Sequence, residues 1–264
     1  MAGQPTEATP RRRVARALNI GHSAGFRHSG TPIAMQPGSS RSPTLADRVR
    51  SSAKGLFDQC LSYLGIGGRV RREPVTASAA LQAYLSSRAS FIAQTSLYGY
   101  LRTRAGQRYP ELFDDDRFVM SINVAKWHMW LACLSDLTVF AGGLLARGGV
   151  PLEQVGRLMT GLLDTILDDN GLPGDAGPDY TEHASQVRAR IALTAWADVD
   201  DGEGCFRESP SALVKYAPVV EALKRMDEDI VQRSVRYHWV EVRSELRQVL
   251  DPAAVGRAAV AEGI

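Results

Sequence analysis

Apolar residues recur at helical spacing through most of the chain, and the strongest pattern lies between Asp114 and Arg147. This tract begins with three aspartates, is nearly continuously apolar, and is followed by two glycines. Acidic residues favour the positive end of a helix dipole, and glycine commonly follows the last helical turn. Its apolar surface is too broad for a single face. We therefore expect this helix at the centre of a packed helical domain.

Similar spacing predicts helices at residues 45–64, 76–105, 151–167 and 179–197, and a last long helix after Pro218. The last helix carries two apolar stripes, which predict two neighbours, or one neighbour and a partner chain. The first stripe contains Val219, Leu223, Met226, Ile230 and Tyr237, and the second contains Val231, Val235, Val242, Leu246 and Val249.

These elements predict an all-α fold, a single irregular bundle of about six to seven helices around the central apolar helix. The α-helical domain is expected at residues 44–255, with a flexible C-terminus at 256–264. Residues 1–43 are rich in Gly, Pro, Ser, Thr and Arg and poor in large apolar side chains. Such a composition cannot offset the entropy of ordering, so we expect a disordered basic tail. Met35 is an alternative start to Met1.

Charge is distributed unevenly along the chain. The first 72 residues hold 12 Lys/Arg and 3 Asp/Glu, whereas the remainder holds 19 Lys/Arg and 26 Asp/Glu. A mildly acidic domain argues against nucleic acid as its target, because phosphate binding needs clustered Lys and Arg. The basic tail suits peripheral contact with an anionic membrane surface.

The three cysteines, Cys60, Cys133 and Cys205, are odd in number and far apart. They favour a reducing compartment, so a cytoplasmic location is expected. They form neither a CxxC pair nor a zinc-ligand spacing, and we predict no metal and no cofactor.

One catalytic motif occurs, a G-x-S-x-G pattern centred on Ser23. In serine hydrolases this pattern works at a strained turn between a strand and a helix. Here it lies in the Arg-rich tail of a helical protein, with no strands around it. The context therefore disfavours Ser23 as a nucleophile.

His128 and Asp136 are polar residues inside the central apolar helix, and they are the remaining catalytic candidates. The alternative is that each meets a buried polar need, such as a backbone amide or an arginine from another helix, because an unpaired buried carboxylate is costly. The apolar stretch at 127–146 has the length of a bilayer span. Asp136 near its middle costs roughly 2.5–3.5 kcal/mol on insertion scales, which favours a buried helix in a globular domain.

Aromatic and basic side chains near the end of the last helix suit contact with a partner protein. Helical geometry places Arg236, Trp239 and Arg243 on one side, although a tryptophan there also suits the edge of the core. The candidates for ligand or partner contact are therefore Trp127, His128, Asp136, Arg236, Trp239 and Arg243.

Several short motifs support a resemblance over roughly residues 76–145. They are Phe91-Ile92-Ala93-Gln94, Tyr100, Arg102, Gly106, Phe113, Phe118, Trp127 and Leu134-Ser135-Asp136-Leu137. Through them the chain resembles a group of uncharacterised bacterial all-helical proteins, which implies no particular activity. The Arg117-Phe118 pair before a Trp-containing apolar helix is also similar to the ubiquinol–cytochrome c chaperone family, whose members are helical assembly factors.

Taken together, the sequence predicts a non-enzymatic interaction or assembly factor with a protein partner or a homo-oligomeric state. The alternative is a small-molecule-binding protein or an enzyme, hydrolase-like or esterase-like, with a pocket near His128 and Asp136.

Overall fold

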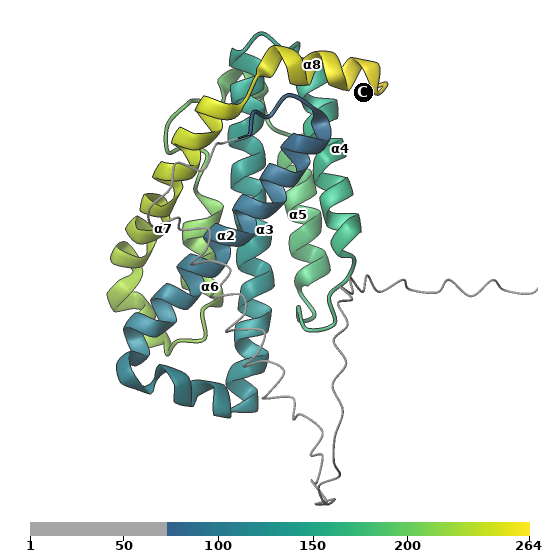
Figure 1. Cartoon of the computed structure of the whole chain (residues 1–264). Coiled ribbons are helices and arrows are strands. Elements are labelled where there is room, and N and C mark those ends of the chain that lie inside the picture. The colour runs from purple at the N-terminus through teal and green to yellow at the C-terminus, as the bar shows by residue number, and fades with distance from the viewer. Residues whose placement is uncertain (1–72) are drawn as a thin grey trace, which may run out of the picture. The chain divides into compact units, whose positions relative to one another are not determined.

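The structure is a computed structural model that describes residues 73–264. The predictions for residues 1–43, the helix at 45–64, Ser23 and Met35 fall outside the described residues. Seven α-helices and two short 3-10 helices form this part of the chain (Figure 1). Their bounds are α2 (Ser78–Ala105), η1 (Gly106–Asp114), α3 (Asp116–Arg147), α4 (Leu152–Asn170), α5 (Tyr180–Ala192), η2 (Trp196–Asp198), α6 (Glu208–Tyr216), α7 (Glu221–Val249) and α8 (Pro252–Ala261).

Helix α3 lies at the centre of the bundle and packs against α2, α4, α5 and α6 (Figure 1). Asp115 caps its start by accepting a hydrogen bond from the backbone amide of Arg117 at 2.8 Å. The helix is long and apolar enough to cross a membrane, yet 89% of its most apolar window is buried among the other helices. The prediction of an all-α bundle around a buried apolar helix is confirmed.

The two ends of the described chain meet at one end of the bundle. The Val75 amide donates to the carbonyl of Val249, and the Asp251 amide donates to the carbonyl of Val75. Asp251 then caps α8 by accepting from the Ala254 amide at 2.9 Å. Residues 256–264 were expected to be a flexible C-terminus. Most of them instead belong to α8, where Ala259 is fully buried.

Two further elements differ from the sequence-based expectation. The helix predicted at 179–197 ends at Ala192, and the chain turns into η2. Helix α6 was not predicted, because it is only nine residues long and follows a polar loop. This short helix packs between α3 and α7 and contributes to the candidate site described below.

Glycine lets η2 approach the central helix closely. A Cβ atom built on Gly142 would overlap the ring of Trp196, and one on Gly143 would overlap Val199. Trp196 is itself 8% exposed, so its ring is held in the core. These two positions in α3 therefore admit no side chain unless η2 moves.

We expect Gly142→Ala to lower the free energy of unfolding by about 1–3 kcal/mol, because overpacking displaces the Trp196 ring. Gly161→Ala is the matched control, since Gly161 lies inside α4 with open space around its added Cβ. Alanine there should raise stability by about 0.5–1 kcal/mol through helix propensity. Thermal unfolding of both variants measures the difference, and two changes of the same sign would contradict the close packing of η2.

Candidate functional site

Asp136 lies at the centre of a buried polar network between α3, α5 and α6. Its side chain is fully buried, and its Oδ1 accepts a hydrogen bond from the Arg190 guanidinium at 2.7 Å. Arg190 also donates to the Ser135 hydroxyl at 2.9 Å and to the Cys205 carbonyl at 2.8 Å. The guanidinium therefore ties α5 to the central helix and to the loop before α6.

The same carboxyl group holds the start of α6. Asp136 Oδ1 accepts from the Glu208 amide at 3.2 Å, and Oδ2 accepts from the Ser209 amide at 2.8 Å and the Ser209 hydroxyl at 2.7 Å. Helix N-termini have amides without intrahelical partners, so a buried α6 needs such an acceptor. The expectation that Asp136 meets a backbone amide or an arginine from another helix is confirmed.

The proton of the Ser209 hydroxyl can be placed from its neighbours. Trp239 Nε1 donates to Ser209 Oγ at 2.9 Å, so the hydroxyl accepts there and gives its own hydrogen to Asp136. Burial raises the pKa of Asp136, while Arg190 and the Ser209 donors oppose that rise. Because each contact made by the two carboxyl oxygens is with a donor, the geometry is that of an ionised carboxylate.

His128 and His183 form a second cluster, about two turns away along α3. Their Nδ1 atoms lie 2.8 Å apart, so one ring donates a hydrogen bond and the other accepts it. Tyr216 of α6 stacks on His128, with ring centroids 4.0 Å apart and planes at 5°. His128 was expected to meet an amide or an arginine, but its partners are these two rings.

Both histidines of this cluster are held neutral. Burial, followed by the neighbouring His183, lowers the pKa of His128 to about 4. Burial and the Lys215 ammonium lower the pKa of His183. At neutral pH the pair is therefore an uncharged hydrogen-bonded link between α3 and α5.

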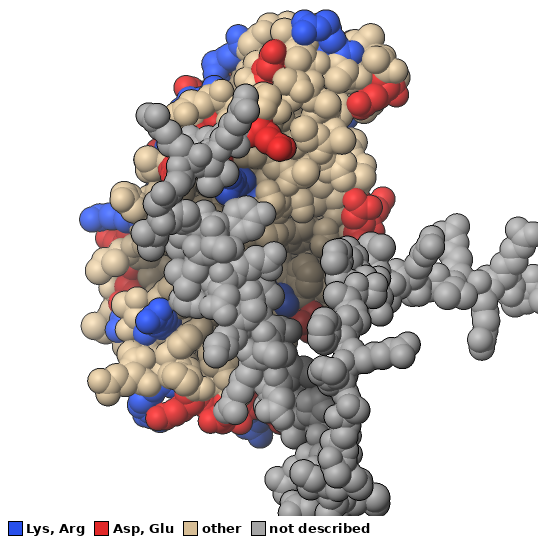
Figure 2. All heavy atoms as spheres, viewed as in Figure 1, with Lys and Arg blue, Asp and Glu red and all other residues tan. Residues whose placement is uncertain are grey.

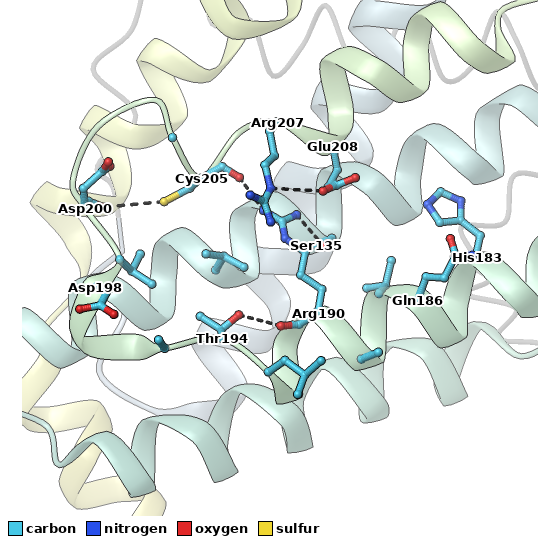
Figure 3. A pocket seen from close by; sticks show the side chains of 17 residues that line it. Ser135, His183, Gln186, Arg190, Thr194, Asp198, Asp200, Cys205, Arg207 and Glu208 are labelled. Atoms are coloured by element: carbon cyan, nitrogen blue, oxygen red, sulfur yellow. Dashed lines mark hydrogen bonds and ion pairs between the residues drawn. The ribbon is translucent and has the colours of Figure 1, made fainter.

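A cavity of about 730 Å³ lies beside the two clusters (Figure 3). Ser135 and Val139 of α3, residues along α5, and the segment from Asp198 to Glu208 form its walls. His128 and Asp136 do not line it, but their partners His183 and Arg190 do. The cavity therefore contacts the partners of His128 and Asp136 and not these two residues themselves.

The two arginines that line this cavity already have partners. Arg190 is used by Asp136, Ser135 and Cys205, and Arg207 pairs with Glu208 at 3.4 Å (Figure 3). Burial raises the pKa of the Cys205 thiol, so it is not poised as a thiolate nucleophile. Within residues 73–264, no group of three or more His, Cys, Asp and Glu side chains is placed to hold a metal ion.

The remaining candidates are spread over three places. Trp127 is half-buried and donates from Nε1 to Asp175 at 2.6 Å. Trp239 is fully buried against Phe206, so it belongs to the core and does not reach a partner. Arg243 pairs with Glu203 at 3.6 Å and is 14% exposed, whereas Arg236 bonds Gln232 one turn away.

Sequence reasoning did not identify His183, Arg190, Ser209 or Tyr216 as members of these clusters. A signal existed for Arg190, because a buried Asp136 requires a cation or several donors. Which arginine supplies the charge could not be read from spacing, since 54 residues separate the two.

The chain matches no protein-family model, no curated protein and no solved structure. The resemblance to uncharacterised bacterial helical proteins and to the ubiquinol–cytochrome c chaperone family stays a prediction from the residues that carry it.

Proposed function

We propose that this protein is a non-enzymatic helical interaction factor that binds its partner through the solvent-facing side of α7. The observation that carries the proposal is a row of large apolar residues that are 37–76% exposed. We call this row the α7 stripe; it consists of Leu223, Met226, Ile230, Tyr237 and Val240.

The opposite side of the same helix packs in the core. Val231, Val235, Val242 and Leu246 are at most 5% exposed, and α7 contacts α2 and α6 there. At about 100° per residue, the mean direction of the α7 stripe is roughly 150° away from that of these residues. Folding of residues 73–264 therefore accounts for only one of the two apolar stripes predicted from the sequence.

An exposed apolar row of this kind is a favourable place for association. Removing apolar surface from water on docking is favourable in free energy. Contiguous exposed apolar patches therefore commonly mark interaction sites. The stripe also follows helical spacing, which suits a partner helix. On the face seen in Figure 2, Lys and Arg lie among Asp and Glu rather than in one basic patch, which fits a protein partner better than nucleic acid.

The alternative function is small-molecule binding in the cavity beside His183 and Arg190, because its size lies in the range of ligand pockets. It ranks second because both arginines that line the cavity, Arg190 and Arg207, are already paired within the chain. A ligand retained in the native mass spectrum of the wild-type protein, and lost on obstructing the cavity with Ala189→Trp, would favour this alternative.

The docking proposal is tested by charging the α7 stripe. We expect Met226→Glu combined with Ile230→Glu to abolish partner binding while changing the free energy of unfolding by no more than about 0.5 kcal/mol per site, because both positions are on the surface. Partner contacts are measured in cells with a photo-crosslinking residue at position 230, and the adducts are identified by mass spectrometry.

Met120 provides the matched control for this experiment. It is 62% exposed on α3, so Met120→Glu and a crosslinker at position 120 test an exposed methionine outside the stripe. Equal adduct yields at positions 120 and 230 would show that the α7 stripe is not a docking surface.

A further inference from the structure

The α7 stripe has a seven-residue repeat. Leu223, Ile230 and Tyr237 are one heptad apart, and a second series three residues later consists of Met226, Arg233 and Val240. This is the spacing of a coiled-coil seam, which fits one helix lying along the stripe. At 1.5 Å per residue, the stripe from Leu223 to Val240 is about 25 Å long.

Charge changes sign along the same side of α7. Asp229 and Arg236 both flank the stripe along the same edge. Asp229 lies in its N-terminal half, and Arg236 follows seven residues later. Arg233 occupies the seam between them and is exposed, as is Asp229. This edge is acidic at Asp229 and basic at Arg236, so these two positions are complementary to each other when a second helix runs in the reverse direction.

We infer that the partner of the α7 stripe is a second copy of this chain, whose α7 lies antiparallel to the first. This inference rests on the proposed function, because it names the partner of that docking surface. A two-fold axis then relates the two copies, so each contact occurs twice, as in the commonest class of homodimer.

One antiparallel register sets four of the five stripe residues against one another. With the symmetry axis between Val231 and Gln232, Leu223 faces Val240 of the second copy and Met226 faces its Tyr237. The sulfur of Met226 thus meets an aromatic ring, a favourable contact. Next to the axis, Ile230 faces Arg233, whose methylene groups cover it while the guanidinium reaches the edge. The reciprocal contacts repeat on the other side of the axis.

The charges lie next to this axis. Asp229 is level with Ser234 of the second copy, so it lies within two residues of both Arg233 and Arg236 of that copy. In a parallel pair the two-fold axis runs along the helices, so the two Asp229 side chains, and likewise the two Arg236 side chains, lie on opposite sides of the seam. Asp229 can therefore approach Arg236 of the second copy only in the antiparallel arrangement.

A charge-swap experiment tests the pairing directly. One full-length variant carries Asp229→Lys, which leaves only basic groups at the axis, and another carries Arg233→Glu with Arg236→Glu, which leaves only acidic ones. We expect the wild-type chain to sediment as a dimer at micromolar concentration. Each variant alone should raise the dimer dissociation constant at least about tenfold, and an equimolar mixture should restore dimers.

Arg157→Glu is the control, because it reverses an exposed charge on α4, away from the stripe. It should leave the dissociation constant unchanged. Circular dichroism melts of each variant verify that loss of dimer is not loss of fold, since all substituted side chains are at the surface or half-buried.

The outcomes separate the self-pairing from the docking surface itself. A monomeric wild-type chain whose position 230 crosslinks in cells to a different protein overturns the self-pairing but keeps the docking surface. Crosslinks to residues 44–72 of the same chain, or stripe-dependent binding to anionic vesicles, also overturn the self-pairing. A dimer insensitive to both charge variants places the interface elsewhere. No adduct above the level of position 120 rejects both proposals.

Discussion

Replacing Asp136 with alanine is expected to lower the free energy of unfolding by about 3–5 kcal/mol, as when one partner of a buried ion pair is removed. The variant leaves the Arg190 guanidinium in the interior without its counter-ion. It also removes the acceptor for the Glu208 and Ser209 amides, which are the first amides of α6. Buried donors without acceptors add their own desolvation penalty. Urea unfolding followed by circular dichroism measures the loss.

Asp164→Ala is the matched control for burial. Asp164 also pairs with an arginine of α5, Arg188, at the same distance of 2.7 Å, but the two side chains are 43% and 42% exposed. Exposed pairs contribute at most about 1 kcal/mol, so this variant should be far less destabilised. Similar losses in both variants would contradict the central role of the buried network. Unchanged stability of Asp136→Ala with loss of binding would make Asp136 a functional residue.

The conservative change Asp136→Asn distinguishes charge from hydrogen bonding. Donors approach both carboxyl oxygens, Arg190 and the Glu208 amide at one and Ser209 at the other. An amide group in either orientation therefore points its own hydrogens at a donor. We therefore expect the free energy of unfolding of Asp136→Asn to be closer to that of Asp136→Ala than to that of the wild type.

The central helix could be predicted because its signal is local. From Asp115 to Arg147 the capping residue, the continuous apolar run and the following glycines all lie within one stretch of sequence, and they agree. Both apolar stripes of α7 were also visible locally. The sequence could not show which stripe would be buried and which exposed, because that depends on how α2 and α6 pack against the helix.

The start of α6 shows why other parts could not be predicted. Its nine residues make only about two and a half turns, too few for a periodic pattern to stand out, and its first amides are held by Asp136, more than 70 residues earlier in the chain. A helix stabilised mainly by such a tertiary contact leaves little local pattern. Helix α8 did carry a local signal, since Asp251 caps it and Pro252 follows at the first position, a combination typical of helix starts.

Only part of the candidate site could be predicted from the sequence, because its residues come from distant parts of the chain. His128 and Asp136 could be singled out because polar residues in a buried apolar helix require partners. Their partners, His183 and Arg190, lie on α5, where most neighbouring polar residues are solvated and therefore give no comparable signal. A sequence shows which buried group needs a partner more readily than it shows which residue supplies one.

The protein is expected to lose stability on acidification through the histidine pair. The folded pKa of His128 is about 4, below its ordinary value of about 6.5. As pH falls below about 6.5, the unfolded chain binds a proton that the folded chain excludes, so the free energy of unfolding decreases until about pH 4. The contribution of His128 over this window is about 3 kcal/mol, since one pKa unit corresponds to about 1.4 kcal/mol.

The order of protonation follows from exposure. His183 lines the cavity, whereas His128 is 1% exposed, so the first proton is taken up on His183, whose Nδ1 then donates to His128. A second proton would place two cations side by side in the interior, next to Lys215. The two groups therefore titrate as a coupled pair, with His128 as the more acidic site.

The variant His128→Phe tests this assignment, because phenylalanine keeps a ring against Tyr216 and cannot take up a proton. Its free energy of unfolding should fall less steeply than that of the wild type between pH 6.5 and 4, while His183 and His238, whose pKa values burial also lowers, keep part of the dependence. NMR titration of the ring protons measures the pKa of His128 directly. In His183→Phe that pKa should rise but stay below 6.5, because burial is the larger cause. A wild-type His128 that titrates near 6.5 would show that α3, α5 and α6 do not enclose it as described.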